Sequence, residues 1–269
     1  MSKVIAVVQE KGGVSKTTTV KNLAAGLVAR GYKVLAIDLD ASANLAKSMG
    51  IRDEEDKTIC RILDNFIEDD DFPDNAPDVI ISSEEGFDII AGSYDVHDYE
   101  LILPSQMMKE IIIRNYIATL GNKYDYILLD CQAGLGILTT NALFAADYLI
   151  VPISAEFLAI DAMQNLFKKI AKVRKANGTF TKPEVLGVLF TQVRANTRNN
   201  RDLMKMSRDQ YGHNVNLFDN TIPLTTLIPE SDAAGESVLK YAPHSIAALQ
   251  YNNFIDECLA LLKEKEGER

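Results

Sequence analysis

The sequence has no tryptophan and only three cysteines and three histidines. Cys60, Cys131 and Cys258 are widely separated and include no C-x-x-C pair, which argues against a disulfide framework and against a zinc or iron–sulfur site. The histidines are equally scattered and show no pattern of a nucleophile triad. We therefore expect three lone buried thiols in a reducing compartment.

Long hydrophobic runs are also missing. The longest apolar stretches, such as Ala142 to Ile153, are broken by Asp147 and are too short to span a bilayer, and no signal-peptide pattern is present. We expect a cytoplasmic protein with no membrane partner. The 269 residues carry a net charge of −10 with 47% apolar residues, which indicates a globular chain, and we expect one domain over residues 1–269.

The charge is unevenly spread along the chain. Residues 53–88 hold 14 acidic and 2 basic residues, whereas residues 161–208 hold 11 basic and 3 acidic residues. We interpret the acidic segment as a solvated surface; a metal-binding loop is the alternative, but no regular ligand spacing supports it. The basic segment can hold a polyanion although the protein is acidic, because charges act over a Debye length of about 8 Å.

Short apolar runs alternate with segments of helical periodicity. This alternation predicts an α/β fold of the doubly wound class, with a mostly parallel sheet, helices on both faces and ligands at the carboxyl ends of the strands. The expected strands are Val4–Val8, Lys33–Asp38, Phe87–Ala91, Tyr126–Asp130, Tyr148–Ile153 and Val185–Thr191.

Helical spacing predicts several helices between these strands. One long helix is expected over Tyr99–Leu120, with Met107, Met108, Ile111, Ile112 and Ile117 in the core. The other expected helices follow residue 19 or cover Thr58–Phe66, Leu158–Lys175 and His244–Lys263.

The most informative stretch is E-K-G-G-V-S-K-T-T-T at residues 10–19, between the first strand and a helix. Backbone N–H groups of such a turn point into one concavity at the positive end of the helix, where a polyphosphate can bind. Lys16 would reach the β- and γ-phosphates, and the Thr17 hydroxyl would ligate Mg²⁺. The alternative is a Gly-Lys-Thr helix start that binds no ligand.

These residues resemble the deviant Walker A motif of the ParA/MinD family of P-loop ATPases, usually KGGVGKTT. The resemblance implies that Lys16 acts in cis and Lys11 in trans, on the nucleotide of a second subunit. It further implies that Gly12, Gly13, Val14, Ser15, Lys16, Thr17 and Thr18 contact ATP, with Pro223 beside the adenine. Ser15 replaces a glycine; a left-handed serine costs about 1 kcal/mol, so we expect nucleotide binding with weak hydrolysis.

Three aspartates follow strands that end beside the phosphate loop. Asp38-Leu39-Asp40-Ala41-Ser42-Ala43-Asn44 resembles the family motif DxDPQxN without its proline and glutamine, which implies that Asp40 positions the attacking water and that Asp38 belongs to the metal site. Tyr126–Asp130 has the Walker B arrangement, so Asp130 is expected to contact Mg²⁺. Gln132–Gly136 resembles the switch segment that follows the Walker B motif in this family. Carboxylates that merely end strands in solvent are the alternative.

The basic residues after the last predicted strand resemble the DNA-contacting region of the ParA/Soj branch. Arg194, Arg198, Arg201, Lys205 and Arg208 recur at spacings of three to four, as on one face of a helix and its leading loop. Arg198 matches the family's DNA-contacting arginine best. Leu224 stands where many members have a second one, and a solvated basic helix is the alternative interpretation.

The resemblance implies a ParA-type ATPase that partitions plasmids or chromosomes. It would form a homodimer with ATP and Mg²⁺, bind DNA nonspecifically on the nucleoid, and hydrolyse ATP slowly under stimulation by a ParB-like partner. Sequence-specific operator binding is not expected, because the chain starts at the first strand. The acidic residues among Asn252 to Arg269 argue against a MinD-type membrane helix. A nucleotide switch that positions a protein cargo with little hydrolysis is the other candidate.

Overall fold

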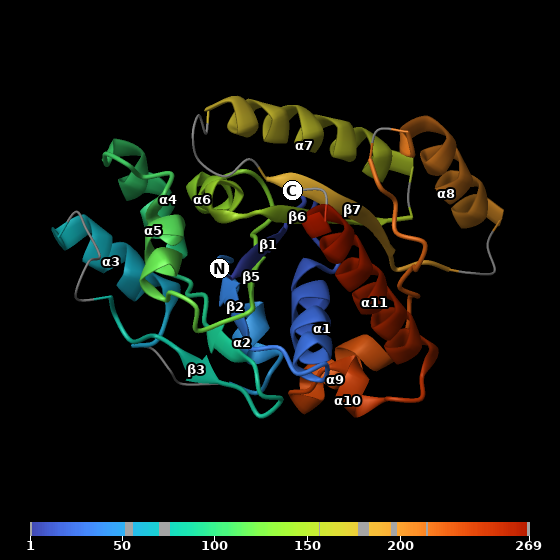
Figure 1. Cartoon of the computed structure of the whole chain (residues 1–269), viewed down its shortest axis with the longest axis horizontal. Coiled ribbons are helices and arrows are strands. Elements are labelled where there is room, and N and C mark those ends of the chain that lie inside the picture. Colours follow the sequence, from blue (N-terminus) through green and yellow to red (C-terminus); the bar gives the residue numbers. More distant parts are fainter. Residues whose placement is uncertain are drawn as a thin grey trace.

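The computed structural model describes residues 2–51, 56–69, 76–155, 157–176, 183–194, 198–213 and 215–267. Within these ranges, side chains at positions 69, 157–162, 164, 176, 198–201 and 203 are not described. The described strands form one seven-stranded sheet in the order β3-β4-β2-β5-β1-β6-β7 (Figure 1). They are β1 Lys3–Val7, β2 Val34–Asp38, β3 Ile81–Ser82, β4 Asp88–Ile90, β5 Tyr126–Asp130, β6 Tyr148–Ser154 and β7 Glu184–Thr191.

All strand pairs are parallel except β3 with β4. The central strands are buried on both faces because alternate residues enter two different clusters: Val4 and Ala6 of β1 join one, and Ile5 and Val7 join the other. A parallel sheet covered on both sides needs such continuous apolar strands. The predicted doubly wound α/β class is therefore confirmed.

Helices cover the two faces as Figure 1 shows. One face carries α1 Lys16–Val28, α9 Leu227–Ala234, α10 Val238–Tyr241 and α11 Ile246–Gly267. The other face carries α3 Ile59–Asp69, α4 Val96–Ile102, α5 Ile112–Thr119, α6 Ile137–Ala145 and α7 Phe157–Ala176. A short helix, α2 Asn44–Lys47, follows β2, and α8 Arg198–Tyr211 follows β7.

The predicted long helix over Tyr99–Leu120 is wrong. The chain forms α4, a 3-10 turn over Leu103–Ser105, an irregular loop and then α5. Pro104 lies in the 3-10 turn, and proline disfavours a continuing helix because it lacks an N–H and restricts the preceding residue.

The core assignment within this segment is only partly correct. Met107 and Met108 are 84% and 57% exposed, so both predictions are wrong. Ile111 and Ile112 are buried and Ile117 packs against the core, as predicted. All three cysteines are free and buried, which confirms the interpretation as lone thiols.

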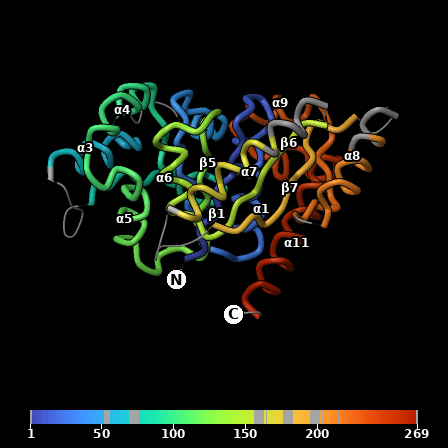
Figure 2. The backbone as a smooth tube through the Cα atoms, turned by 90° about the horizontal axis from the view of Figure 1, so that it is seen from above, coloured from blue at the N-terminus to red at the C-terminus, as the bar shows by residue number. Residues whose placement is uncertain are grey.

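The first strand and the last helix lie together at the amino ends of the strands. Lys3 Nζ, at the start of β1, forms an ion pair of 2.7 Å with Glu266 in the last turn of α11. Figure 2 shows both ends of the chain on the same side of the molecule. Among the described helices, none combines the length and apolarity needed to cross a bilayer.

Candidate nucleotide-binding site

The phosphate loop joins β1 to α1, and its backbone conformation follows from two left-handed residues. Gly13 has φ 72° and Ser15, immediately before α1, has φ 65° and ψ 36°. Glycine adopts this region freely, whereas for serine it is strained by about 1 kcal/mol. Ser15 thus adopts the left-handed conformation, and Lys16 begins the helix with 7% exposure.

Residues at the carboxyl end of β7 hold the phosphate loop through hydrogen bonds to its backbone carbonyls. Thr191 Oγ1 donates to the carbonyl of Val14 at 3.1 Å and is also within 3.2 Å of the Ile153 carbonyl. Gln192 Nε2 donates to the Gly13 carbonyl at 2.6 Å and lies 3.3 Å from Ser15 Oγ. Sequence reasoning missed Gln192. Its position just after a predicted buried strand was the available signal.

Asp38 and Asp130 end two neighbouring strands and lie opposite each other in the register of β2 and β5. Both are fully buried. Burial raises the pKa of Asp38 to about 7, although the N–H groups of Asp40 and Leu45 donate to its carboxylate at 2.9 and 3.1 Å and oppose the shift. Burial, and then the charge of Asp38, raise the pKa of Asp130 well above its usual range, while Thr17 and Lys16 act in the opposite direction.

Asp130 has the environment expected of a metal ligand. Neither carboxylate oxygen has a hydrogen-bond partner of good geometry among the described residues, although both are buried. A buried unpaired carboxylate is costly, and a divalent cation would offset that cost and favour ionisation. Among the described residues, His, Cys, Asp and Glu form no group of three that could hold a metal ion by themselves. Mg²⁺ commonly takes one or two carboxylates and completes its shell with phosphate and water.

Asp40 lies at the edge of the same site and is partly solvated. Its Oδ1 accepts hydrogen bonds from the backbone N–H and the hydroxyl of Ser42, at 2.9 and 2.6 Å. The loop that carries it is also tightly packed: a Cβ on Gly92 would lie 2.4 Å from the Asp40 carbonyl oxygen. Asp40 is therefore held by local bonds while its carboxylate stays accessible.

One cavity of about 750 Å³ brings most of the predicted residues together. Its lining includes Gly12, Gly13, Ser15, Lys16, Thr17, Thr18, Asp40 and Pro223. Of the described loop residues, Lys11 and Val14 do not contribute to this lining, and the Val14 side chain is buried. The cavity thus joins the phosphate loop, the Asp40 loop and the segment around Pro223 in one space, as the sequence predicts.

Two further residues at this cavity were not predicted. Asp232 of α9 lines it, and the buried ammonium group of Lys21, on α1, donates to the Asp232 carboxylate and to the Glu236 carbonyl, the latter at 2.8 Å. Burial lowers the pKa of Lys21, and Asp232 opposes the shift. More than 200 residues separate the partners, so local patterns could not reveal the pair.

The basic segment is partly described. Residues from Arg198 onward form α8, as predicted, but the side chains of Arg198 and Arg201 lie outside the described residues. Arg194 and Lys205 are exposed. Arg208 instead pairs with Asp219 at 3.0 Å and donates to the Phe218 carbonyl at 3.0 Å. Arg208 therefore anchors α8 to the following segment.

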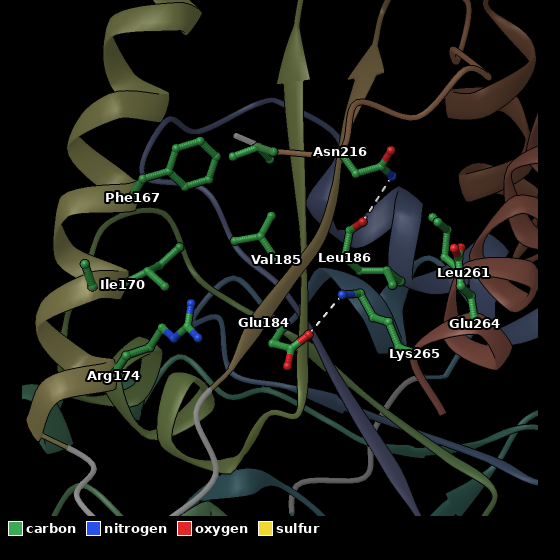
Figure 3. Close-up of a pocket in the computed structure, with 12 residues that line it drawn as sticks. Phe167, Ile170, Arg174, Glu184, Val185, Leu186, Asn216, Leu261, Glu264 and Lys265 are labelled. Atoms are coloured by element: carbon green, nitrogen blue, oxygen red, sulfur yellow. Dashed lines mark hydrogen bonds and ion pairs between the residues drawn. The ribbon is translucent and has the colours of Figure 1, made fainter. Parts of the chain in front are cut away.

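A second cavity, of about 710 Å³, lies at the amino end of β7 between α7 and α11 (Figure 3). Phe167, Ile170 and Leu261 give it an apolar lining, and Lys265 pairs with Glu184 at its edge at 2.9 Å. None of the sequence-predicted site residues lines this cavity. The residues predicted to bind the nucleotide lie instead around the cavity beside the phosphate loop.

Comparison with known proteins agrees with this geometry. A family model described as an AAA domain, AAA_31, matches residues 2–182. The sporulation initiation inhibitor protein Soj of Bacillus subtilis is 30% identical over 260 residues, which cover 97% of this chain and 99% of Soj. The chain belongs to the ParA/Soj family of partitioning ATPases. The chromosome partitioning protein ParA of Caulobacter vibrioides is 28% identical over 271 residues, with 98% of this chain and 97% of ParA covered.

A solved structure extends the ParA/Soj comparison to bound ligands. Cobyrinic acid a,c-diamide synthase from Mycobacterium smegmatis, with a bound ATP analogue and magnesium, superimposes with a TM-score of 0.82 at 28% identity. The match covers all of this chain and 97% of that chain. The shared fold thus accommodates an ATP analogue and magnesium in that protein.

Proposed function

We propose that this protein is a ParA-type partitioning ATPase that binds ATP and Mg²⁺, dimerises with ATP, binds DNA nonspecifically and hydrolyses ATP slowly. The observation that carries the proposal is the single cavity lined by the phosphate loop, Asp40 and Pro223, with the Asp130 carboxylate, which accepts no hydrogen bond of good geometry from a described residue, buried beside the loop. A phosphate clamp, a metal ligand and a water-positioning carboxylate suffice for phosphoryl transfer to water, which depends mainly on positioning and charge stabilisation.

The residues take separate roles in this proposal. The loop N–H groups and Lys16 hold the phosphates, Thr17, Asp38 and Asp130 form the metal side, and Asp40 orients the attacking water. Mg²⁺, when bound, neutralises charge that develops on the phosphate oxygens. Lys11, which lies outside the lining of its own cavity, reaches the nucleotide of a second copy.

DNA binding is assigned to the segment that begins at Arg194 and continues along α8. Arg194, Arg198, Arg201 and Lys205 supply phosphate contacts. Arg208 pairs with Asp219. Such contacts need no base recognition, which suits a protein that moves over the nucleoid in the cytoplasm. A ParB-like activator completes the cycle by stimulating hydrolysis.

A nucleotide switch that positions a protein cargo with little hydrolysis is the second candidate. The strained backbone of Ser15 favours it, because this residue lines the cavity where a flexible glycine would leave more room. ATP turnover of the wild type and of Ser15→Gly separates the candidates. Measurable turnover in both proteins supports the ATPase, and turnover only after restoration of glycine supports the switch.

Dimerisation is tested by light scattering with ATP and Mg²⁺ and with ADP. We expect the wild type to dimerise only with ATP. Lys11→Ala should not dimerise, whereas Asp40→Ala should still dimerise but should not hydrolyse ATP. Lys123→Ala, an exposed lysine before β5, is the matched control for loss of a positive charge. A monomer under all conditions would refute the proposed cycle.

A further inference from the structure

Glu100 of α4 uses both carboxylate oxygens to hold the loop that follows β5. Oε1 accepts a hydrogen bond from Gln132 Nε2 at 2.6 Å, and Oε2 accepts one from the backbone N–H of Ile137 at 3.0 Å. Ile137 is the first residue of α6, so the carboxylate also lies at the positive end of that helix. One side chain therefore fixes both ends of the segment Gln132–Ile137.

The loop is shaped to admit this carboxylate. A Cβ on Gly136 would lie 2.4 Å from each oxygen of Glu100. The glycine is not needed for its backbone conformation, because its φ of −69° and ψ of −175° are accessible to any residue. A side chain at position 136 would therefore displace the Glu100 carboxylate from the position in which it accepts its two hydrogen bonds.

The loop held in this way borders the nucleotide cavity. Gln132 comes two residues after Asp130, and Ala133 lines the cavity. A Cβ on Gly12 of the phosphate loop would be 3.8 Å from the Ala133 Cβ, an ordinary packing distance. A shift of Gln132–Gly136 would therefore change the wall that faces the phosphate loop.

The segment that leads to Glu100 also contacts the Asp40 loop. Gly92, eight residues earlier, packs so closely that a Cβ there would lie 2.4 Å from the Asp40 carbonyl oxygen and 3.0 Å from the Asp38 carboxyl carbon. α4 begins shortly afterwards at Val96. The stretch from Gly92 to Glu100 thus touches both carboxylate-bearing segments of the site.

From these contacts we infer that Glu100 is a positioning residue for ATP hydrolysis: it holds Gln132–Gly136 against the phosphate loop and in register with the Asp40 loop. The inference rests on the proposed ATPase function. Glu100 does not line the cavity, so its loss should lower kcat through a misplaced loop. The KM for ATP should change little, because the loop N–H groups and Lys16 that hold the phosphates remain in place.

The test compares Glu100→Gln, Glu100→Ala and Gly136→Ala. Glu100→Gln keeps the shape but has only one acceptor oxygen for two donors. In all three variants we expect kcat to fall about tenfold, a moderate loss for a displaced loop, with the KM for ATP within about twofold of wild type. Asp98→Asn, on the exposed side of α4, is the matched control and should leave kcat unchanged.

A double-mutant cycle tests directly whether Gly136 matters through its contact with Glu100. Once Glu100 is shortened to alanine, a methyl group at position 136 has space, so Gly136→Ala should reduce kcat in the wild type but not in Glu100→Ala. Additive losses would overturn the inference, because they would show that Gly136 matters for another reason.

Amide hydrogen exchange at Ile137 separates this inference from the proposed function. Exchange should be faster in Glu100→Ala than in wild type, and this measurement requires no turnover. If wild type fails to hydrolyse ATP, the proposed function fails. Unchanged exchange, or faster exchange with unchanged kcat and KM, would overturn the role of Glu100.

Discussion

Lys21 and Asp232 form an asymmetrically buried ion pair beside the nucleotide cavity: the Lys21 side chain is fully buried, whereas the Asp232 side chain is 37% exposed. The pair joins α1, which begins at the phosphate loop, to α9, which contributes to the lining of the same cavity. Water can solvate Asp232 but not Lys21. Removing Asp232 should therefore lower the stability of the protein by a different amount than removing Lys21.

Asp232→Ala should destabilise the protein more than Lys21→Met. Among the described residues, the first change leaves the buried ammonium group with the Glu236 carbonyl as its remaining hydrogen-bond acceptor, which costs about 3 kcal/mol for a broken buried pair. The second leaves a carboxylate that water can reach, so we expect about 1 kcal/mol. Urea unfolding at pH 7.5 measures both, and equal losses would contradict the asymmetry.

The loss in the free energy of unfolding that Asp232→Ala causes should become smaller as the pH rises. Burial places the folded pKa of Lys21 below its unfolded value of about 10.4, so between the two values the unfolded chain binds more protons and stability increases with pH. Asp232 is the main group that raises this pKa, and Glu85 contributes less. Removing Asp232 therefore lowers the folded pKa further and extends the pH range in which stability increases with pH to lower values. Unfolding at pH 7.5 and 9.5 tests this, and Lys21→Met, which lacks the titrating amine, should lose the effect.

Replacements at Ser15 should measure the strain in the phosphate loop. Ser15→Gly relieves about 1 kcal/mol of left-handed strain, offset in part by the greater freedom of glycine in the unfolded chain. Ser15→Val should destabilise, because a β-branched residue tolerates φ 65° poorly. Thermal unfolding without nucleotide should rank the proteins glycine, serine, valine in falling stability. A valine variant as stable as wild type would contradict a strained Ser15.

Exposed and anchored basic residues of α8 should respond differently to charge reversal. Lys205→Glu should weaken nonspecific duplex binding with ATP present, reduce the salt dependence of log K by about one unit, and leave stability unchanged. Arg208→Glu should lower stability, because the new glutamate would place a negative charge beside Asp219 and the hydrogen bond to the Phe218 carbonyl would be lost. Fluorescence anisotropy across salt concentrations and urea unfolding measure the two effects. Unchanged salt dependence in Lys205→Glu would remove this residue from the DNA face.

The loop between α4 and α5 should tolerate changes that the core does not. Met108 is exposed with φ 56°, so Met108→Gly should be neutral or stabilising, whereas Ile112→Ala should cost about 3 kcal/mol. Met107→Ala is the control for loss of an exposed methionine. A large loss at Met108 would show that its side chain has a partner.

The sheet and the phosphate loop could be predicted because their signals are local. Apolar runs such as Tyr126–Asp130 become buried strands, and the glycine pair between a strand and a helix forms the turn that leads into α1. Parallel strands then bring Asp38 and Asp130 together at one edge, although the residues are far apart in the sequence.

The residues that support the site escaped prediction for a physical reason. Glu100, Gln192 and Lys21 act through contacts with residues 32 to 211 positions away, and a single charged or amide side chain carries no periodic signal of its partner. The break at Pro104 is different. There the sequence did contain the signal, and helical spacing of apolar residues on both sides concealed it.

The ion pair between Lys3 and Glu266 has a consequence for how this chain can be rearranged. It places the start of β1 beside the end of α11, at the amino ends of the strands, whereas the nucleotide cavity lies at their carboxyl ends. A short flexible linker could therefore join these two points, and new termini could be opened in an exposed loop such as that around Asn122. Such a circular permutant should retain the nucleotide site, because the order in which the strands are connected would change while their neighbours in the sheet would not.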